Sequence, residues 1–149
     1  MAATKLVDGA GRTVPDHLVE VGSFFAQGYQ PVLDFAGWRV AMLRYGKEVD
    51  PGALHQVERH WNTNEVFILT AGQADLLILD GDEAPLGPGH VIPMVHSVAY
   101  NVGQSVWHHV LMSPDAHIVL IERSETGLAT SDYAKLAPDV IAGLLLQMR

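Results

Sequence analysis

The sequence contains no cysteine. It therefore forms no disulfide and offers no thiolate that could act as a nucleophile. The same absence excludes a sulfur-ligated metal of the zinc-finger type. Any metal bound by this chain has to take nitrogen and oxygen ligands.

Basic residues are also scarce. Nine Lys and Arg residues stand against seventeen Asp and Glu residues, and the formal net charge is −8 at pH 7. Because nucleic-acid binding needs a clustered Lys and Arg surface, and the basic residues here are scattered, we expect no nucleic-acid partner.

Long hydrophobic runs are missing as well, although 48% of the residues are apolar. No run approaches the roughly 18 residues that a membrane-spanning helix requires. Residues 1–8 lack the basic start, the apolar core and the cleavage site of a secretory signal. We therefore predict a globular, cytoplasmic protein that does not associate with a membrane.

Helical periodicity is absent from the central part of the sequence. Short strand-like runs occur there instead, separated by clusters of Gly, Pro, Asn and Asp. Evenly spaced runs of this kind are typical of a β-sandwich or a small β-barrel. The predicted strands cover residues 38–45, 54–61, 65–70, 73–79, 90–94, 98–102, 107–112 and 117–122.

A chain of 149 residues is long enough for one domain with a substantial core. We predict an N-terminal arm over residues 1–37, a barrel over 38–126 and a C-terminal extension over 127–149. Within the extension, Pro138 can open a helix, and Val140, Ile141 and Leu144 recur at helical spacing. This helix is expected to pack on the barrel or on a neighbouring subunit.

Four residues with metal-binding side chains fall on the predicted strands in a suggestive pattern. Residues two apart on a strand face the same way, so Glu58 and His60 share one face. Glu65 begins the next strand after a polar turn and can approach His60 across the hairpin. Of the adjacent His108 and His109 only one can face the interior, and the turn spacing favours His108. Imidazole and carboxylate ligands suit Fe, Mn, Ni, Co or Zn.

Other interpretations of these residues stay open. A Glu-x-His pair on a strand is often a surface or salt-bridged pair, and a purely structural β-domain would leave such polar residues exposed. If the pair is buried without a metal, two neighbouring carboxylates repel each other, which raises one pKa and produces an acid/base pair. The remaining histidines have no partner spacing and are interpreted as structural or exposed: His17, His55, His90, His96 and His117.

Two stretches together resemble the two conserved segments of the cupin superfamily. The first family segment has the pattern His-x-His-(four residues)-Glu-(six residues)-Gly. Its four fixed positions are occupied here by Glu58, His60, Glu65 and Gly72. The departure is Glu58, which stands where the family has its first histidine. The second segment, Pro-x-Gly-x-x-His, is matched in spacing by Gly103-x-Ser105-x-x-His108, in which both turn residues are replaced by other small residues. The later Asn of that segment is not evident.

This resemblance implies an all-β double-stranded β-helix, also called a jelly roll or cupin barrel, that commonly forms homodimers. It implies that His60, Glu65 and His108, which have the same residue types as the family's ligands, bind a metal. Glu58 is implied as a fourth ligand only because it occupies the position of the family's first histidine. Two carboxylates offset more of the charge of a divalent ion than imidazoles do, and they favour harder ions such as Mn or Fe over Zn. Phe67, Leu69, Leu77, Trp107 and Met112 are expected on the inner faces, where they could line an apolar pocket or simply fill the core.

The predicted function follows from this site. We expect a divalent-metal-dependent enzyme that acts on a small organic molecule, with Glu58 and Glu65 as catalytic residues and a reaction of the oxygenase or isomerase/lyase type. The alternative is a non-catalytic cupin that binds or senses a small molecule. The family name does not select between these functions, because one fold hosts many chemistries.

Overall fold

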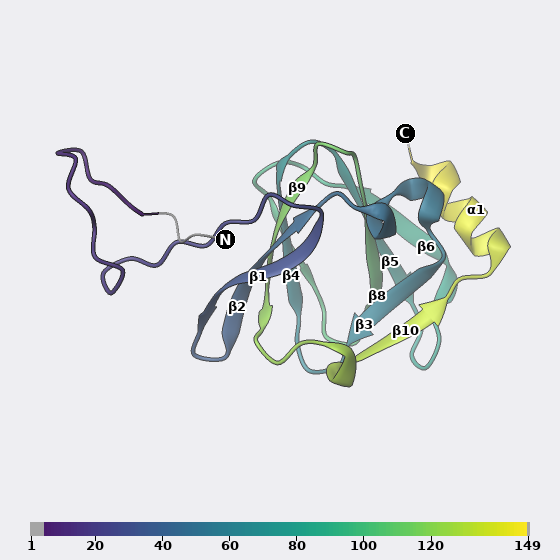
Figure 1. The fold of residues 1–149 in the computed structure, drawn as a ribbon. Helices are drawn as coiled ribbons and strands as arrows, with labels where there is room; N and C mark the ends of the chain where they lie inside the picture. Colours follow the sequence, from purple (N-terminus) through teal and green to yellow (C-terminus); the bar gives the residue numbers. More distant parts are fainter. Residues whose placement is uncertain (1–4, 149) are drawn as a thin grey trace.

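A computed structural model describes residues 5–148, which form ten β-strands, three short 3-10 turns and one α-helix. The strands build two antiparallel five-stranded sheets that face each other (Figure 1). The first sheet has the order β1 (Gly28–Phe35), β2 (Trp38–Arg44), β9 (His117–Arg123), β4 (Glu65–Ala71) and β7 (Ala99–Val102). The second has the order β10 (Ser131–Lys135), β3 (Gln56–His60), β8 (Trp107–Met112), β5 (Ala74–Asp80) and β6 (Leu86–Pro93).

Both sheets turn alternate side chains toward the space between them, as the period of a β-strand requires. Leu69 and Ile118 of the first sheet pack there with Leu76 and Met112 of the second, and all four are almost fully buried. This arrangement confirms the predicted all-β, jelly-roll-like fold. Within residues 5–148 no strand pair joins the two sheets, so the predicted barrel is a sandwich with open edges rather than a closed cylinder.

The sheets reach beyond residues 38–126 at both ends. β1 comes from the segment expected to be an arm and pairs with β2, and β10 comes from the C-terminal extension and pairs with β3. The β1 segment was not predicted as a strand because Gly28 and Pro31 interrupt its pattern. The structure places it at the edge of its sheet, where a proline that donates no hydrogen bond is tolerated.

The segment before β1 projects away from the sheets (Figure 1). It contains a small hairpin around the bridge between Val7 and Thr13, and the side chains of Leu18 and Phe25 are exposed. Only its last part docks: Phe24 is buried, and its carbonyl accepts a hydrogen bond of 2.8 Å from Arg44 Nε.

The predicted homodimer and cytoplasmic location stay predictions.

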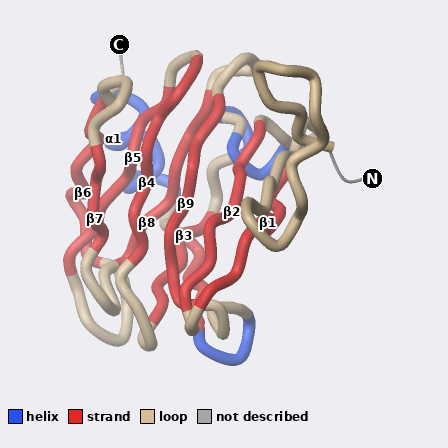
Figure 2. The backbone as a smooth tube through the Cα atoms, turned by 90° about the vertical axis from the view of Figure 1, so that its left-hand side faces the viewer, coloured by secondary structure: helices blue, strands red, loops and turns tan. Residues whose placement is uncertain are grey.

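The C-terminal helix α1 (Pro138–Gln147) covers the outer face of the second sheet, as predicted (Figure 2). Leu144 is 1% exposed and packs in a second core with Leu77 and Trp107. A Cβ at Gly89 of β6 would lie 2.8 Å from Leu144 Cδ2 and 2.9 Å from Leu79 Cγ, so both leucine side chains would have to move to admit a larger residue. Among the described residues no helix has the length and apolar character needed to cross a membrane.

The second core corrects one expectation. Leu77 and Trp107 were placed on the inner faces, but both belong to the second core, on the opposite side of the second sheet, which α1 covers. Strands β5 and β8 are apolar on both faces because one face meets the first sheet and the other meets the helix. A period of two separates the faces of such a strand but does not say which one points into the cavity.

Candidate metal centre

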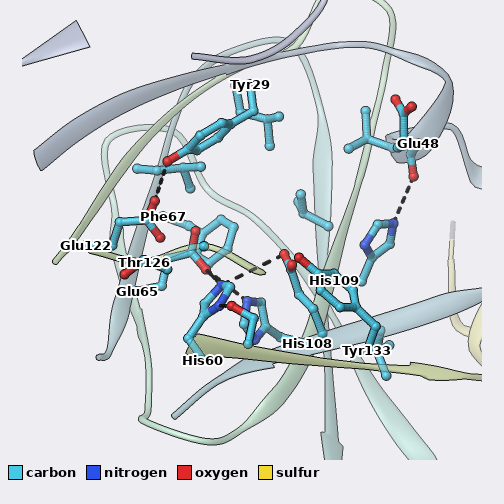
Figure 3. A pocket seen from close by; sticks show the side chains of 18 of the residues that line it. Tyr29, Glu48, His60, Glu65, Phe67, His108, His109, Glu122, Thr126 and Tyr133 are labelled. Atoms are coloured by element: carbon cyan, nitrogen blue, oxygen red, sulfur yellow. Dashed lines mark hydrogen bonds and ion pairs between the residues drawn. The ribbon is translucent and has the colours of Figure 1, made fainter. Parts of the chain in front are cut away.

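The four candidate side chains meet between the two sheets. β3 contributes Glu58 and His60, β8 contributes His108, and β4 of the facing sheet begins with Glu65. Glu58 and His108 are direct register partners across the β3–β8 pair. The predicted geometry is therefore confirmed: residues two apart on β3 point the same way, and the turn over residues 61–64 brings Glu65 back beside His60 (Figure 3).

The distances within this cluster are short. His60 Nε2 and His108 Nε2 lie 3.0 and 2.9 Å from the same oxygen, Glu65 Oε2. Glu58 Oε1 lies 4.0 Å from His60 Nε2. One donor atom from each of the four residues falls within 4.8 Å of every other. His60, Glu65 and His108 are 6%, 5% and 2% exposed, which rules out a purely structural domain with exposed polar residues at these positions.

The outer nitrogens of both imidazoles are already engaged. His108 Nδ1 lies 2.9 Å from the carbonyl oxygen of Val106, and His60 Nδ1 lies 2.6 Å from the hydroxyl of Ser131. Because a carbonyl oxygen only accepts, His108 Nδ1 must carry its hydrogen. A neutral His108 then turns the lone pair of Nε2 toward a carboxylate oxygen at 2.9 Å. Two acceptors at this distance require either a proton or a cation between them.

Burial and charge pull the pKa values of the two carboxylates in opposite directions. Burial raises the pKa of Glu58, and the charge of Glu65 adds to this effect while His108 and His60 oppose it. Burial also acts to raise the pKa of Glu65, but the hydrogen bonds and positive charges of His108 and His60 outweigh it and hold the pKa well below its usual value. Such a separation is the pattern expected of an acid/base pair.

The same interactions act on the histidines. Burial alone would lower the pKa of His60 and of His108, but the hydrogen bond and the charge of Glu65, with the charge of Glu58, raise both above 6.5. Without another cation, protons on the imidazoles balance the charge of Glu65.

The four side chains fit a divalent cation. Donors that sit about 2.0–2.2 Å from an ion are separated from each other by at most about 4.4 Å. The observed limit of 4.8 Å is therefore only a few tenths of an ångström too wide. The Nε2 lone pairs converge on Glu65 and the Nδ1 atoms are held by Val106 and Ser131, which is the outer hydrogen bonding that orients metal-bound histidines.

The two turns of the predicted motif have the backbone that such a motif needs. Gly72, which ends the first segment, has a φ of +69°, and a Cβ there would lie 2.5 Å from Ala116 Cα. Ser105 stands at the glycine position of the second segment and adopts a φ of +63°. Its backbone N–H donates a 2.8 Å hydrogen bond to the carbonyl of His60, so this turn ties the two segments together.

A cavity of about 400 Å³ opens onto the cluster. Of the predicted inner-face residues only Phe67 lines it, while Leu69 and Met112 belong to the core between the sheets. His109, which was predicted to be solvent-facing or hydrogen-bonded, also lines the cavity, and its Nε2 lies 3.1 Å from the backbone carbonyl of Glu48. The five histidines interpreted as structural or exposed all lie outside the cluster.

Several further polar residues line the cavity and were missed from the sequence, among them Tyr29, Arg39 and Glu122. Tyr29 and Arg39 both donate hydrogen bonds to the Glu122 carboxylate, and Figure 3 shows the contact from Tyr29. A signal for Glu122 existed, since it continues the buried face of Ile118 and Leu120 on β9 and a carboxylate there demands a partner. No pattern in the sequence indicated Tyr29.

No protein-family model matches this sequence, and no curated protein does either. Solved structures do match in fold. Pac13 from Streptomyces, described as a nucleoside dehydratase, has a cupin fold and superposes with a TM-score of 0.52 at 9% identity, covering 78% of this chain and 86% of its own. The chain has the cupin fold.

Two further cupin-type structures are similar at a lower level. A cupin-2 domain protein from Shewanella frigidimarina has a TM-score of 0.49 at 18% identity and covers 66% of this chain and 84% of its own. A hydroquinone 1,2-dioxygenase, solved with Cd²⁺ and 4-hydroxybenzonitrile, has a TM-score of 0.48 at 16% identity and covers 66% of this chain and 63% of its own. At these identities the likeness concerns the cupin fold and not the reaction.

Proposed function

We propose that this cupin-fold protein is a divalent-metal-dependent enzyme that acts on a small organic molecule. The observation that carries the proposal is the convergence of His60 Nε2 and His108 Nε2 on one oxygen of Glu65, with His108 Nδ1 committed to a carbonyl. This arrangement supports a cation at the centre of the cluster. The adjoining cavity supports a small-molecule substrate, because it is concave, its surface is mostly apolar and several polar side chains converge on it.

His60, Glu65 and His108 would hold the ion, and Glu58 would complete the set or act beside it. Once bound, a divalent ion supplies Lewis-acid chemistry or, as a redox metal, dioxygen chemistry at an open position. Glu58 is the least buried of the four, with a side chain 32% exposed, and burial raises its pKa. It is therefore placed to hold a proton at the cavity wall, whereas Glu65 stays ionised. Both an oxygenase and an isomerase or lyase can use this pair.

A second candidate function is a non-catalytic module that binds a small molecule without a metal. The observation in its favour is that protons alone complete the network: two protonated imidazoles can each donate to Glu65, and both histidine pKa values are raised. The metal content of the protein separates the two functions.

The test is elemental analysis of protein purified without chelator, with the His60→Ala/His108→Ala double variant beside it. The side chains of His17 and His90 are exposed and form no hydrogen bonds within residues 5–148, so a double alanine variant of these two provides the matched control. Stoichiometric Fe, Mn, Ni or Zn that is lost in the first variant and kept in the second supports the enzyme. A metal content near zero, with no rise in thermal stability on adding divalent ions, supports the binding module, because a ligand of the folded state must stabilise it.

A further inference from the structure

A third carboxylate lies beside the metal cluster, on the next strand of the first sheet. β4 and β9 are antiparallel partners, with Val66 opposite Ile121, and the same register brings Glu65 opposite Glu122. Both side chains turn toward the interior, where Glu65 is 5% and Glu122 is 2% exposed. Directly opposed residues have Cβ atoms about 4.5–5.5 Å apart. A molecule held at the cluster is therefore within reach of Glu122.

Only one oxygen of Glu122 is occupied. Oε1 accepts from the hydroxyl of Tyr29 and from Arg39 Nε and Nη2, at 3.1 and 2.8 Å for the two guanidinium nitrogens. Arg39 is in turn held by the carbonyls of Ser124 and Thr126, at 2.9 and 2.7 Å. Oε2 accepts no hydrogen bond from residues 5–148, and it opens onto the cavity rather than being sealed in the core.

The missing partner of Oε2 defines the chemistry of a ligand. A carboxylate oxygen only accepts, so the ligand has to present a donor. Carboxylates dominate this part of the molecule, since Glu48, Glu58, Glu65 and Glu122 all line the cavity and Arg39 is the only Lys or Arg side chain among the lining residues. An anionic group beside Glu122 would be repelled by these carboxylates. A cationic group would have to give up its hydration in a largely enclosed site, which costs more than burying an uncharged donor. An uncharged hydroxyl meets these conditions.

We propose that Glu122 is a ligand-binding residue whose Oε2 accepts a hydrogen bond from a hydroxyl group of the small uncharged molecule that binds at the Glu58, His60, Glu65 and His108 centre. Tyr29 and Arg39 are positioning residues, since they hold Oε1 and so aim Oε2 at the cavity. The proposal rests on the proposed function, because the other end of the bound small molecule is held by the metal centre.

The test uses two probes with the same metal-binding head. 3-Hydroxypropanohydroxamic acid and butanohydroxamic acid both chelate divalent ions through the hydroxamate, and they differ only by a terminal hydroxyl in place of a methyl group. Their affinities for the Mn²⁺-loaded protein are measured by calorimetry. We expect the hydroxylated probe to bind about tenfold more tightly, as a hydrogen bond to a charged acceptor allows.

Variants assign that preference to Glu122. Glu122→Gln keeps the shape and removes the charge, and it should reduce the preference to about threefold or less. Arg39→Met/Glu122→Leu replaces the buried pair as a unit, which avoids an unpaired buried charge, and should abolish the preference. The control is Asp132→Asn, which alters a carboxylate paired with Arg59 at 2.9 Å outside the cavity and should leave the preference unchanged.

The outcomes separate this proposal from the metal-dependent function. Mn²⁺ binding with equal affinity for the two probes overturns the role of Glu122 and leaves the metal centre intact. A preference that survives in both Glu122 variants, or that disappears in Asp132→Asn, also overturns it. A protein that does not bind Mn²⁺ overturns both proposals.

Discussion

Glu58 and His108 lie directly opposite each other across strands β3 and β8, and this is the only register pair that joins the two strands in the described part of the chain. The cluster therefore lies where β3 and β8 pair. Glu58 stands where the cupin pattern has a histidine, so the character of the site depends on a carboxylate at that position.

Glu58→His should shift the metal preference toward Zn²⁺ and Ni²⁺. An imidazole is a softer ligand than a carboxylate and offsets none of the charge of the ion. We expect the ratio of Zn²⁺ to Mn²⁺ affinity to rise by about tenfold or more, equivalent to about 1.4 kcal/mol. Competition titrations with a chromophoric chelator measure both affinities. Glu48→His, at the rim of the same cavity but outside the cluster, is the control. An unchanged ratio in Glu58→His would show that Glu58 is not a ligand.

Ser131→Ala should weaken metal binding without removing a ligand. The Ser131 hydroxyl contacts His60 Nδ1 at 2.6 Å in a buried position and orients the ring. Loss of such an outer contact typically costs about 10- to 100-fold in metal affinity. The matched control is Ser113→Ala, which removes another hydrogen-bonded hydroxyl in a turn away from the cavity. Equal affinities of the two variants would contradict an orienting role for Ser131.

The metal-free protein should lose stability as the pH rises above 6.5. The folded-state pKa values of His60 and His108 are raised above 6.5, mainly because the hydrogen bonds and charge of Glu65 overcome burial. A raised pKa means tighter proton binding in the folded state. This proton binding stabilises the folded state fully at pH values below the unfolded-state pKa, and the stabilisation is lost as the pH passes through the folded-state pKa. Burial lowers the pKa of His109 to about 4, so His109 acts in the opposite direction, but its effect levels off once the pH is about one unit above the unfolded-state pKa and cannot mask the loss at higher pH.

Urea unfolding of chelator-treated protein across this pH range measures the effect. The His60→Gln/His108→Gln double variant should show a flatter profile above pH 6.5, because the two titrating groups are gone. A wild-type free energy of unfolding that stays constant or increases with pH in this window would refute the coupling between Glu65 and the histidines.

Ser105→Gly should stabilise the protein. Ser105 adopts a left-handed backbone with a φ of +63°, which costs a residue with a Cβ roughly 1–2 kcal/mol. Glycine avoids this strain but loses more conformational freedom on folding, so we expect a net gain of about 0.5–1 kcal/mol. Ser105→Ala keeps the Cβ and should give no gain. Chemical denaturation of the three proteins decides the matter, and a destabilised Ser105→Gly would show that the serine hydroxyl matters more than the backbone.

Local pattern was sufficient for the centre of the site. The alternation of a β-strand placed Glu58 and His60 on one face, and the four-residue spacing to Glu65 implied a hairpin that returns beside them. Both follow from short stretches of chain whose geometry is set by backbone sterics, and the structure bears them out. Turn spacing selected His108 over His109, but its approach to Glu65 needed the family resemblance as well, because nothing local links residues 43 positions apart.

What the tertiary structure alone decided is the rest of the cavity. Tyr29 reaches Glu122 across 93 positions of sequence, and Ser131 reaches His60 across 71. Such contacts depend on which strands become neighbours, and strand order is chosen by the packing of the whole sheet rather than by any segment. The same reason explains why Trp107 faces the helix and His108, next to it, faces the cavity. The sequence shows that both are buried, but only the position of α1 and of the facing sheet determines what each side chain meets.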